Sequence, residues 1–253
     1  MVRLKYRLAN LQGVGKRERQ EDSFVFVNAV DERLLNERGL FFAVCDGMGG
    51  MADGALASQT AVTSLKDSFQ RIDRSGDMAV QLKDIIYKAS EEVEKLIGGD
   101  GGSTVVAGIV YEDALYFASV GDSFLWLLRD GQLCRFNREM NVCHRQYMEE
   151  IRDGVIDPGD FQELREATAL TGFLGMRGLD DIDCCVRPLP LRENDVILAC
   201  SDGVGGVIVE DDVLSALSSG TEQEMCTRLE QLLVDYSVPN QDNYTAVVVR
   251  CES

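Results

Sequence analysis

The sequence has few of the residues on which several common catalytic sites depend. His144 is the only histidine among 253 residues, so a zinc site built from several histidines and a paired-histidine acid–base mechanism are both excluded. The chain contains neither a G-x-S-x-G elbow nor a C-x5-R loop, which argues against a serine or cysteine nucleophile and a covalent intermediate. Any chemistry here has to depend on other groups.

Basic residues are also scarce. The chain has 25 Lys and Arg against 43 Asp and Glu, a formal charge of -18. A protein that binds nucleic acids or anionic membranes needs a basic face, so we expect neither as a partner. A basic or neutral protein partner is compatible with this charge. The acidic excess also has a plain explanation as a solubilising surface.

Long apolar runs and linker-like tracts are missing as well. No run reaches the length of a membrane span, and the first residues lack the apolar core of a signal peptide, so we expect a cytoplasmic protein. Eight cysteines without a C-x-x-C pair are interpreted as mostly buried thiols. With four prolines and no polar low-complexity tract, residues 1–253 are predicted to form one domain, and we expect a monomer.

What the sequence does contain is many short apolar runs and a few amphipathic segments. Strands are predicted over 3–10, 22–30, 39–45, 104–111, 114–120, 123–129, 132–136, 183–188, 195–200 and 245–251. Tight turns at Glu112-Asp113 and Asp130-Gly131 predict antiparallel hairpins. Apolar periodicity predicts helices over 53–71, 79–97, 210–219 and 221–236.

The order of these elements predicts the fold class. Strands and helix pairs do not alternate as in a doubly wound sheet. They favour an α+β fold, a four-layer αββα sandwich in which two antiparallel sheets pack face to face between helix pairs.

Four acidic motifs lie at the ends of predicted strands: Glu21-Asp22, Asp46-Gly47, Asp202-Gly203 and Asp242-Asn243. An ionised carboxylate at the mouth of a buried strand is costly unless a cation or strong donor compensates it. Alone, either Asp-Gly motif is explained by an ordinary turn. Together the four motifs predict a site for one or two hard cations, Mg²⁺ or Mn²⁺, with the glycine shaping a sharp turn at each aspartate.

Arginines precede the first acidic motif. A guanidinium beside a metal–carboxylate cluster suits a phosphoryl group, because its planar fork matches two phosphate oxygens. The alternative is a salt bridge to one of the acids, and spacing alone does not decide between Arg17 and Arg19. Two cations that activate a water for in-line attack on phosphorus need only the acids named above.

Successive segments of the chain resemble one known family. R-x-R-Q-E-D (17–22), VCDGMGG (44–50), GGSTVVAGIV (101–110), ASVGDSFLWLLRDG (118–131), ALTGFLGM (169–176), ACSDGV (199–204) and QDNYTAVVV (241–249) are similar, in order, to the signatures of the type 2C metal-dependent protein phosphatases, in their bacterial form. The resemblance covers nearly the whole chain and implies the same sandwich fold.

The resemblance also implies roles for individual residues. Asp46 would bridge two Mg²⁺ or Mn²⁺ ions, and Glu21, Asp22, the Gly47 carbonyl, Asp202 and Asp242 would complete their shells, partly through water. Arg17 falls at the position of the phosphate-binding arginine and is counted with Asp46 as catalytic. Asp122 falls where bacterial members bind a third, weaker ion. Ser103 and Thr104 fall in a G-S-T stretch, which ordinary hydrogen bonding at a strand start explains.

Three positions depart from the pattern. Phe124 replaces the arginine of a GDSR motif, which puts a structural salt bridge in doubt. Met48 stands where many eukaryotic members have a histidine general acid. The leaving group would then be protonated by metal-bound water, or would depart without an acid catalyst. His144 is interpreted as a surface or packing residue of a flap subdomain at about 137–170, a segment broken by Gly154 and Pro158, whose sequence should govern substrate choice.

The leading hypothesis is a serine/threonine phosphatase that hydrolyses phosphoserine and phosphothreonine in proteins and opposes a cognate kinase in signal transduction. The alternative is a non-catalytic regulator on the same fold that only binds phosphoproteins; it would be expected to lack some of the acids. A purely structural Ca²⁺ domain is a third hypothesis, and Arg17 beside the acids argues against it.

Overall fold

The computed structural model, which describes residues 4–49, 53–98, 101–157, 161 and 166–253, contains two facing sheets. One has the order β1-β13-β12-β8-β9 and the other β10-β7-β6-β3-β2, with β11 also paired to β7. The strands are β1 Lys5–Gly13, β2 Ser23–Val27, β3 Leu40–Cys45, β4 Gly47–Gly49, β5 Gly101–Ser103, β6 Val105–Tyr111, β7 Ala114–Val120, β8 Phe124–Arg129, β9 Gln132–Arg135, β10 Asp183–Cys184, β11 Leu189–Pro190, β12 Val196–Cys200 and β13 Tyr244–Glu252. All pairings are antiparallel, as predicted.

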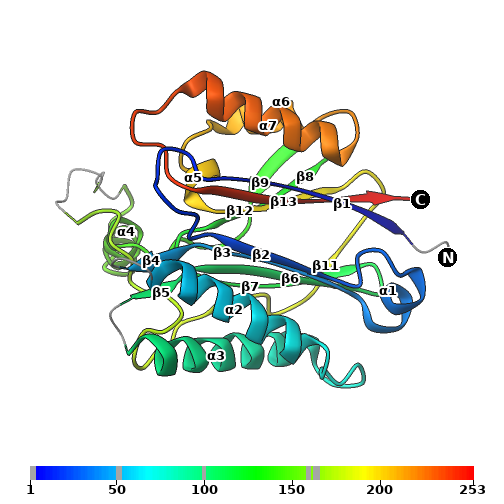
Figure 1. Ribbon diagram of the computed structural model, residues 1–253, viewed down its shortest axis with the longest axis horizontal. Coiled ribbons are helices and arrows are strands. Elements are labelled where there is room, and N and C mark those ends of the chain that lie inside the picture. The colour runs from blue at the N-terminus through cyan, green and yellow to red at the C-terminus, as the bar shows by residue number, and fades with distance from the viewer. Residues whose placement is uncertain (1–3, 50–52, 99–100, 158–160, 162–165) are drawn as a thin grey trace.

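Helices cover the outer faces of both sheets (Figure 1). The helices of the described residues are α1 Glu32–Arg38, α2 Asp53–Phe69, α3 Met78–Ile97, α4 Val142–Arg152, α5 Asp202–Gly205, α6 Glu210–Leu217 and α7 Glu222–Tyr236. The pair α2 and α3 lies on one side of the two sheets and the pair α6 and α7 on the other, so the predicted α+β fold with antiparallel sheets is confirmed. No helix in the described part of the chain is long and apolar enough to cross a membrane.

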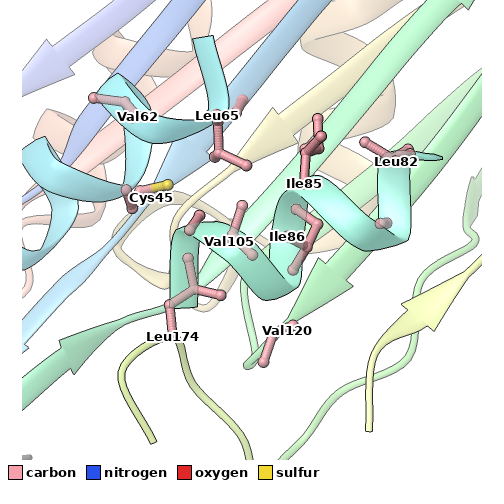
Figure 2. Close-up of a cluster of buried hydrophobic side chains, with 14 of the residues drawn as sticks. Cys45, Val62, Leu65, Leu82, Ile85, Ile86, Val105, Val120 and Leu174 are labelled. Atoms are coloured by element: carbon pink, nitrogen blue, oxygen red, sulfur yellow. The ribbon is translucent and has the colours of Figure 1, made fainter. Parts of the chain in front are cut away.

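Three apolar layers hold the sandwich together. Along β3, Leu40, Phe42 and Val44 face the other sheet, whereas Phe41 and Cys45 face α2 and α3. Because both faces of such a strand are buried, its sequence is a continuous apolar run rather than an alternation. Figure 2 shows part of the layer between the helices and the sheet, where side chains of α2, α3, β3 and β6 meet.

Both predicted hairpins are present. Tyr111 pairs with Ala114 across Glu112 and Asp113, and Arg129 pairs with Gln132 across Asp130 and Gly131. All four turn residues have positive φ angles between 51° and 75°. This backbone matches the strand twist in two-residue hairpins, which explains why glycine and acidic residues occur there.

The predicted boundaries differ from the structure in several places. The first strand runs to Gly13 rather than ending at residue 10, and its pairing with β13 extends to Tyr244. Of the predicted strand 183–188 only Asp183–Cys184 is a strand, β10; Val186 is exposed, and the next strand, β11, begins after the predicted range at Leu189. Helices α1 and α5 were not predicted, because four to seven residues carry too little periodicity; α4, in the segment 137–170, had no predicted helix bounds either. Pro158 lies outside the described residues.

A buried ion pair fixes the end of the sandwich away from the acidic motifs. Arg129 donates from Nε to Oδ1 of Asp195 at 2.8 Å and from Nη2 to Oδ2 at 2.6 Å. The Asp195 side chain is 1% exposed and also accepts the backbone N–H of Arg192. Since the carboxylate has three donors, its burial is compensated only while Arg129 stays in place.

Replacement of Asp195 by Ala is expected to lower the free energy of unfolding by about 3–5 kcal/mol, because the Arg129 charge would be left without its partner. Chemical denaturation monitored by circular dichroism measures this change. Asp181→Ala is the matched control, since it removes an exposed ion pair with Arg138 and should leave the midpoint almost unchanged. An equal effect of the two substitutions would contradict the prediction.

Candidate metal centre

Antiparallel pairing brings the four acidic motifs to one end of the sandwich. Ser23, just after Glu21-Asp22, pairs with Cys45, just before Asp46. In the other sheet Cys200, just before Asp202, pairs with Ala246, four residues after Asp242. The start of one strand and the end of its neighbour therefore meet at the same edge in each sheet, and the two edges face each other (Figure 1).

The acids line one cleft with a volume of about 280 Å³. Its lining consists of Arg17, Glu21, Asp46, Gly47, Met48, Gly49, Thr104, Asp122, Thr168, Leu170, Asp202, Asp242 and Asn243. All predicted site residues except Asp22 are in this set. Asp22 is buried, 4% exposed, and accepts a 2.8 Å hydrogen bond from Ser201 Oγ. Larger hollows of 340–420 Å³ occur elsewhere, but none of these collects so many carboxylates.

Glycines at the site allow close approach of backbones rather than an unusual φ angle. A Cβ at Gly54 would lie 2.9 Å from Oε2 of Glu21 and 3.0 Å from the Gly47 carbonyl oxygen, so these two predicted ligands converge beside α2. A Cβ at Gly203 would lie 1.8 Å from the Asn243 carbonyl oxygen. The predicted sharp turn after each aspartate is wrong, because Gly47 enters β4 and Gly203 lies in α5, both without positive φ.

Ser103 and Thr104 hold the backbone of Asp46. The Asp46 carbonyl accepts from Thr104 N at 2.8 Å and from Ser103 Oγ at 3.0 Å, and Thr104 Oγ1 accepts from Asp46 N at 3.2 Å. The hydrogen bonding expected at this strand start is present. The sequence did not predict that Ser103 and Thr104 would bond to Asp46, because these residues are more than fifty positions apart in the chain.

Asn243 joins the two sheets at the site. Its Oδ1 accepts the backbone N–H of Glu21 at 2.7 Å, and its Nδ2 donates to the carbonyls of Val14 and Arg19, both at 2.9 Å. Ser201 also positions an acid of the site, because its Oγ donates a hydrogen bond to the buried carboxylate of Asp22. Neither positioning role was predicted, because a single amide or hydroxyl gives no signal in the sequence.

Burial and mutual repulsion raise the pKa values of the clustered carboxyls. The pKa of Asp22 is raised to about 6, mainly by burial, with a smaller contribution from the Asp202 charge. The pKa of Asp46 is raised well above its ordinary value by burial and then by the charges of Asp22 and Asp202. Burial, followed by the charge of Asp202, raises that of Asp122 to about 7. Ionisation of these carboxyls is therefore unfavourable in the metal-free cluster.

The donors in this cleft suit hard divalent cations. They are carboxylates and one backbone carbonyl, the oxygen ligands that Mg²⁺ and Mn²⁺ prefer. Oδ1 of Asp22 and Oδ1 of Asp202 are buried and have no hydrogen-bond partner among the described residues. Within those residues no three His, Cys, Asp or Glu side chains form a metal-binding group. Mg²⁺ is usually bound by one or two carboxylates and keeps several of its waters, so it does not need such a group.

Arg17 lies at the rim of the cleft and Arg19 is not part of its lining. Nη2 of Arg17 donates to Oδ2 of Asp242 at 2.6 Å, so the salt bridge considered as the alternative for Arg17 is present. The Arg17 side chain is still 58% exposed, which leaves most of its donors available to an incoming anion.

The other two unusual residues have different positions. Met48, in β4, lines the cleft and has no proton to donate. His144, in α4, is half-buried and is not among the residues that line the cleft. Its Nε2 has no hydrogen-bond partner among the described residues, and burial lowers its pKa. These positions agree with the interpretation of His144 as a packing residue.

Comparisons with known proteins agree with this geometry. The family model described as protein phosphatase 2C matches residues 6–150. The serine/threonine phosphatase stp of Listeria monocytogenes is 27% identical over 215 residues, which are 81% of this chain and 82% of that protein.

Solved structures show the same fold. The PPM Ser-Thr phosphatase MsPP of Mycobacterium smegmatis, in complex with cacodylate, has a TM-score of 0.76 and 25% identity over 96% of this chain and 97% of its own. The catalytic domain of the serine threonine protein phosphatase PstP, in complex with two manganese ions, has a TM-score of 0.77 and 24% identity over 99% of this chain and 100% of its own.

The raised pKa values predict how stability depends on pH in the absence of metal. A folded carboxyl whose pKa lies above its unfolded value binds its proton more tightly when folded, so stability falls as pH rises between the two values. The Asp22 carboxyl alone is expected to contribute about 3 kcal/mol to a fall between about pH 4 and 6, and Asp122 extends the fall to about pH 7.

Thermal unfolding in a chelator between pH 5 and 8 measures this dependence. The midpoint should fall with rising pH, and added Mg²⁺ should restore it most at the higher pH. Asp22→Asn is the control, because it removes one titrating group and should flatten the profile. A midpoint that rises with pH over this range would contradict the prediction.

Proposed function

The chain belongs to the protein phosphatase 2C family, whose members are metal-dependent hydrolases, and we propose that it removes phosphate from phosphoserine and phosphothreonine in proteins at the acidic cleft. The single observation that carries this proposal is the convergence of five separate acids and one arginine on that cleft. A regulator that only binds phosphoproteins would not need to retain the whole acidic set.

We assign the metal ligands to the acidic residues and the glycine carbonyl that line the cleft, together with the buried Asp22. Asp46, Glu21, the Gly47 carbonyl, Asp22, Asp202 and Asp242 would hold two Mg²⁺ or Mn²⁺ ions, and Asp122 a third. The structure of PstP with two manganese ions supports this number for the main pair. Such ions supply charge neutralisation at the phosphoryl group and a water of lowered pKa.

The chain's own residues perform the remaining tasks. Arg17 binds phosphoryl oxygens with the guanidinium donors that Asp242 leaves free, and its exposure at the rim lets it meet the substrate first. Asp242 in turn orients Arg17. Met48 cannot protonate the departing serine or threonine oxygen, so we assign that proton to water.

The flap is proposed to control which phosphoproteins reach the site. We define it as residues 137–170 of the single domain 1–253. Thr168 and Leu170, near its end, line the cleft, and an isolated bridge joins Leu170 to Asn141 at the start of α4. A protein chain bound at the cleft would therefore touch this segment. A cognate serine/threonine kinase, a role in signal transduction, a monomeric state and a cytoplasmic location remain predictions.

Substitution of Asp46 by Asn is expected to lower kcat/KM for p-nitrophenyl phosphate with Mn²⁺ by roughly 10³-fold or more, equivalent to about 4 kcal/mol of transition-state stabilisation. The physical reason is that Asp46 lies among the acids of the cleft, where the charges of Asp22 and Asp202 act on it directly. Asp202→Asn should behave similarly. Activity that survives either change would remove the metal centre from the mechanism.

Arg17→Ala is expected to raise KM for a phosphothreonine peptide by about tenfold, with a smaller effect on kcat, because a ground-state contact to the phosphate is lost. Arg19→Ala is the matched control, since Arg19 lies two residues away but outside the cleft lining. Steady-state kinetics of both variants decide the matter. Equal effects at the two positions, or none at Arg17, would contradict the assignment.

A further inference from the structure

A short loop carries Asp122 into the cleft, and an arginine from the next strand holds that loop. Nη2 of Arg135, at the end of β9, donates to the carbonyl oxygens of Asp122 at 3.1 Å and Ser123 at 3.3 Å. Asn137 adds a 2.8 Å bond from Nδ2 to the same Ser123 carbonyl. The backbone around Asp122 therefore depends on a segment more than ten residues further along the chain.

Arg135 is itself fixed from several sides. Its guanidinium lies over the ring of Phe124, with Cζ 3.8 Å from the ring centroid, and its Nη1 forms an ion pair with Glu139. The Arg135 side chain is only 17% exposed. A guanidinium that is stacked on an aromatic face and paired with a carboxylate loses little further entropy when it makes additional hydrogen bonds.

Phe124 explains why this arrangement is needed. Position 124 directly follows the Asp122-Ser123 pair, and an aromatic side chain there brings no charge to the loop. The ring packs instead against Trp126, with centroids 5.0 Å apart, and provides the platform for Arg135. The positive charge near Asp122 thus comes from β9 rather than from the loop itself.

We propose that Arg135 is a positioning residue that holds the Asp122 carboxylate at the cleft and so sets the affinity of the ion that Asp122 ligates. The proposal rests on the assignment of Asp122 as a metal ligand in the proposed function. Arg135 acts through geometry, because it fixes the backbone of residues 122 and 123 by donating to both of their carbonyl oxygens.

The same arginine connects Asp122 to the flap. Glu139, the partner of Arg135, accepts a 2.9 Å hydrogen bond from Asn141 Nδ2, and Asn141 caps α4 by accepting the N–H of His144 at 2.8 Å. Met140 N also donates to the Gly121 carbonyl at 2.9 Å. A displacement at the root of the flap would therefore be transmitted to the Asp122 loop through Arg135.

Mn²⁺ binding to Arg135→Ala, Asp122→Asn and the double variant tests the proposal. Isothermal titration calorimetry of the metal-free proteins, with fluorescence of the sole tryptophan, Trp126, as a second signal, reports binding without turnover. Arg135→Ala is expected to weaken the weakest class of sites by about tenfold, the usual scale for a group that orients a ligand. The double variant should bind no more weakly than Asp122→Asn alone.

Arg135→Lys and Arg138→Ala complete the set. The lysine keeps the charge but not the planar fork, so it should restore only part of the affinity. Arg138→Ala removes an exposed arginine of the same segment, paired with Asp181, and should leave the isotherm unchanged. If Arg135→Ala does not fold, as judged by circular dichroism, Arg135→Lys and Arg135→Gln replace it. Their Mn²⁺ affinities are then compared in the parent protein and in the Asp122→Asn background.

Two results would overturn the proposal: an unchanged isotherm for a folded Arg135 variant, or the same loss from Arg135→Ala in the Asp122→Asn background as in the parent. Wild-type protein that binds Mn²⁺ but hydrolyses no phosphopeptide would contradict the proposed function and leave the positioning role intact. The two failures are thus distinguishable.

Discussion

The burial of several carboxylates close together is the constraint around which this molecule is arranged. Burial first, and then the charges of neighbouring carboxylates, raises the pKa values of Asp22, Asp46, Asp122 and Asp202 at the mouth of a dry sandwich, where water screens charges little. Such a cluster is unfavourable for folding unless cations enter it. The cost is tolerated because three continuous apolar layers stabilise the strands that carry the acids.

The surroundings of the acids fix their positions rather than neutralise them. Ser103 and Thr104 bind the Asp46 backbone, Asn243 binds that of Glu21, and Arg135 binds that of Asp122. Few of these contacts satisfy the carboxylate oxygens themselves, and two such oxygens are buried with no hydrogen-bond partner in the part of the chain that the structure describes. The free oxygens are therefore available to metal ions, and the rigid backbone limits the reorganisation that binding requires.

Much of the fold was predictable because long apolar runs and helical periodicity survive in the sequence. The hairpins at Glu112-Asp113 and Asp130-Gly131, and the helix pairs, were correctly predicted from local patterns. The short elements α1, α5 and β11 were missed, and β10 was predicted too long, since two to seven residues leave no periodic signal. The supporting roles of Asn243, Ser201 and Arg135 were equally invisible, because each depends on a partner far away in the chain.

The sequence by itself determined which groups are available: oxygen ligands in four strand-end motifs, a single histidine, and arginines beside the first motif. Only the tertiary structure decided how they are used. Antiparallel register brings the strand ends to one edge. As a result Arg17, and not Arg19, lines the cleft, and Asp22 is buried outside the cleft lining. The tertiary structure also brings Arg135 to a loop whose own sequence lacks a positive charge. Side chains far apart in sequence acquire a joint function only through the distances that packing imposes.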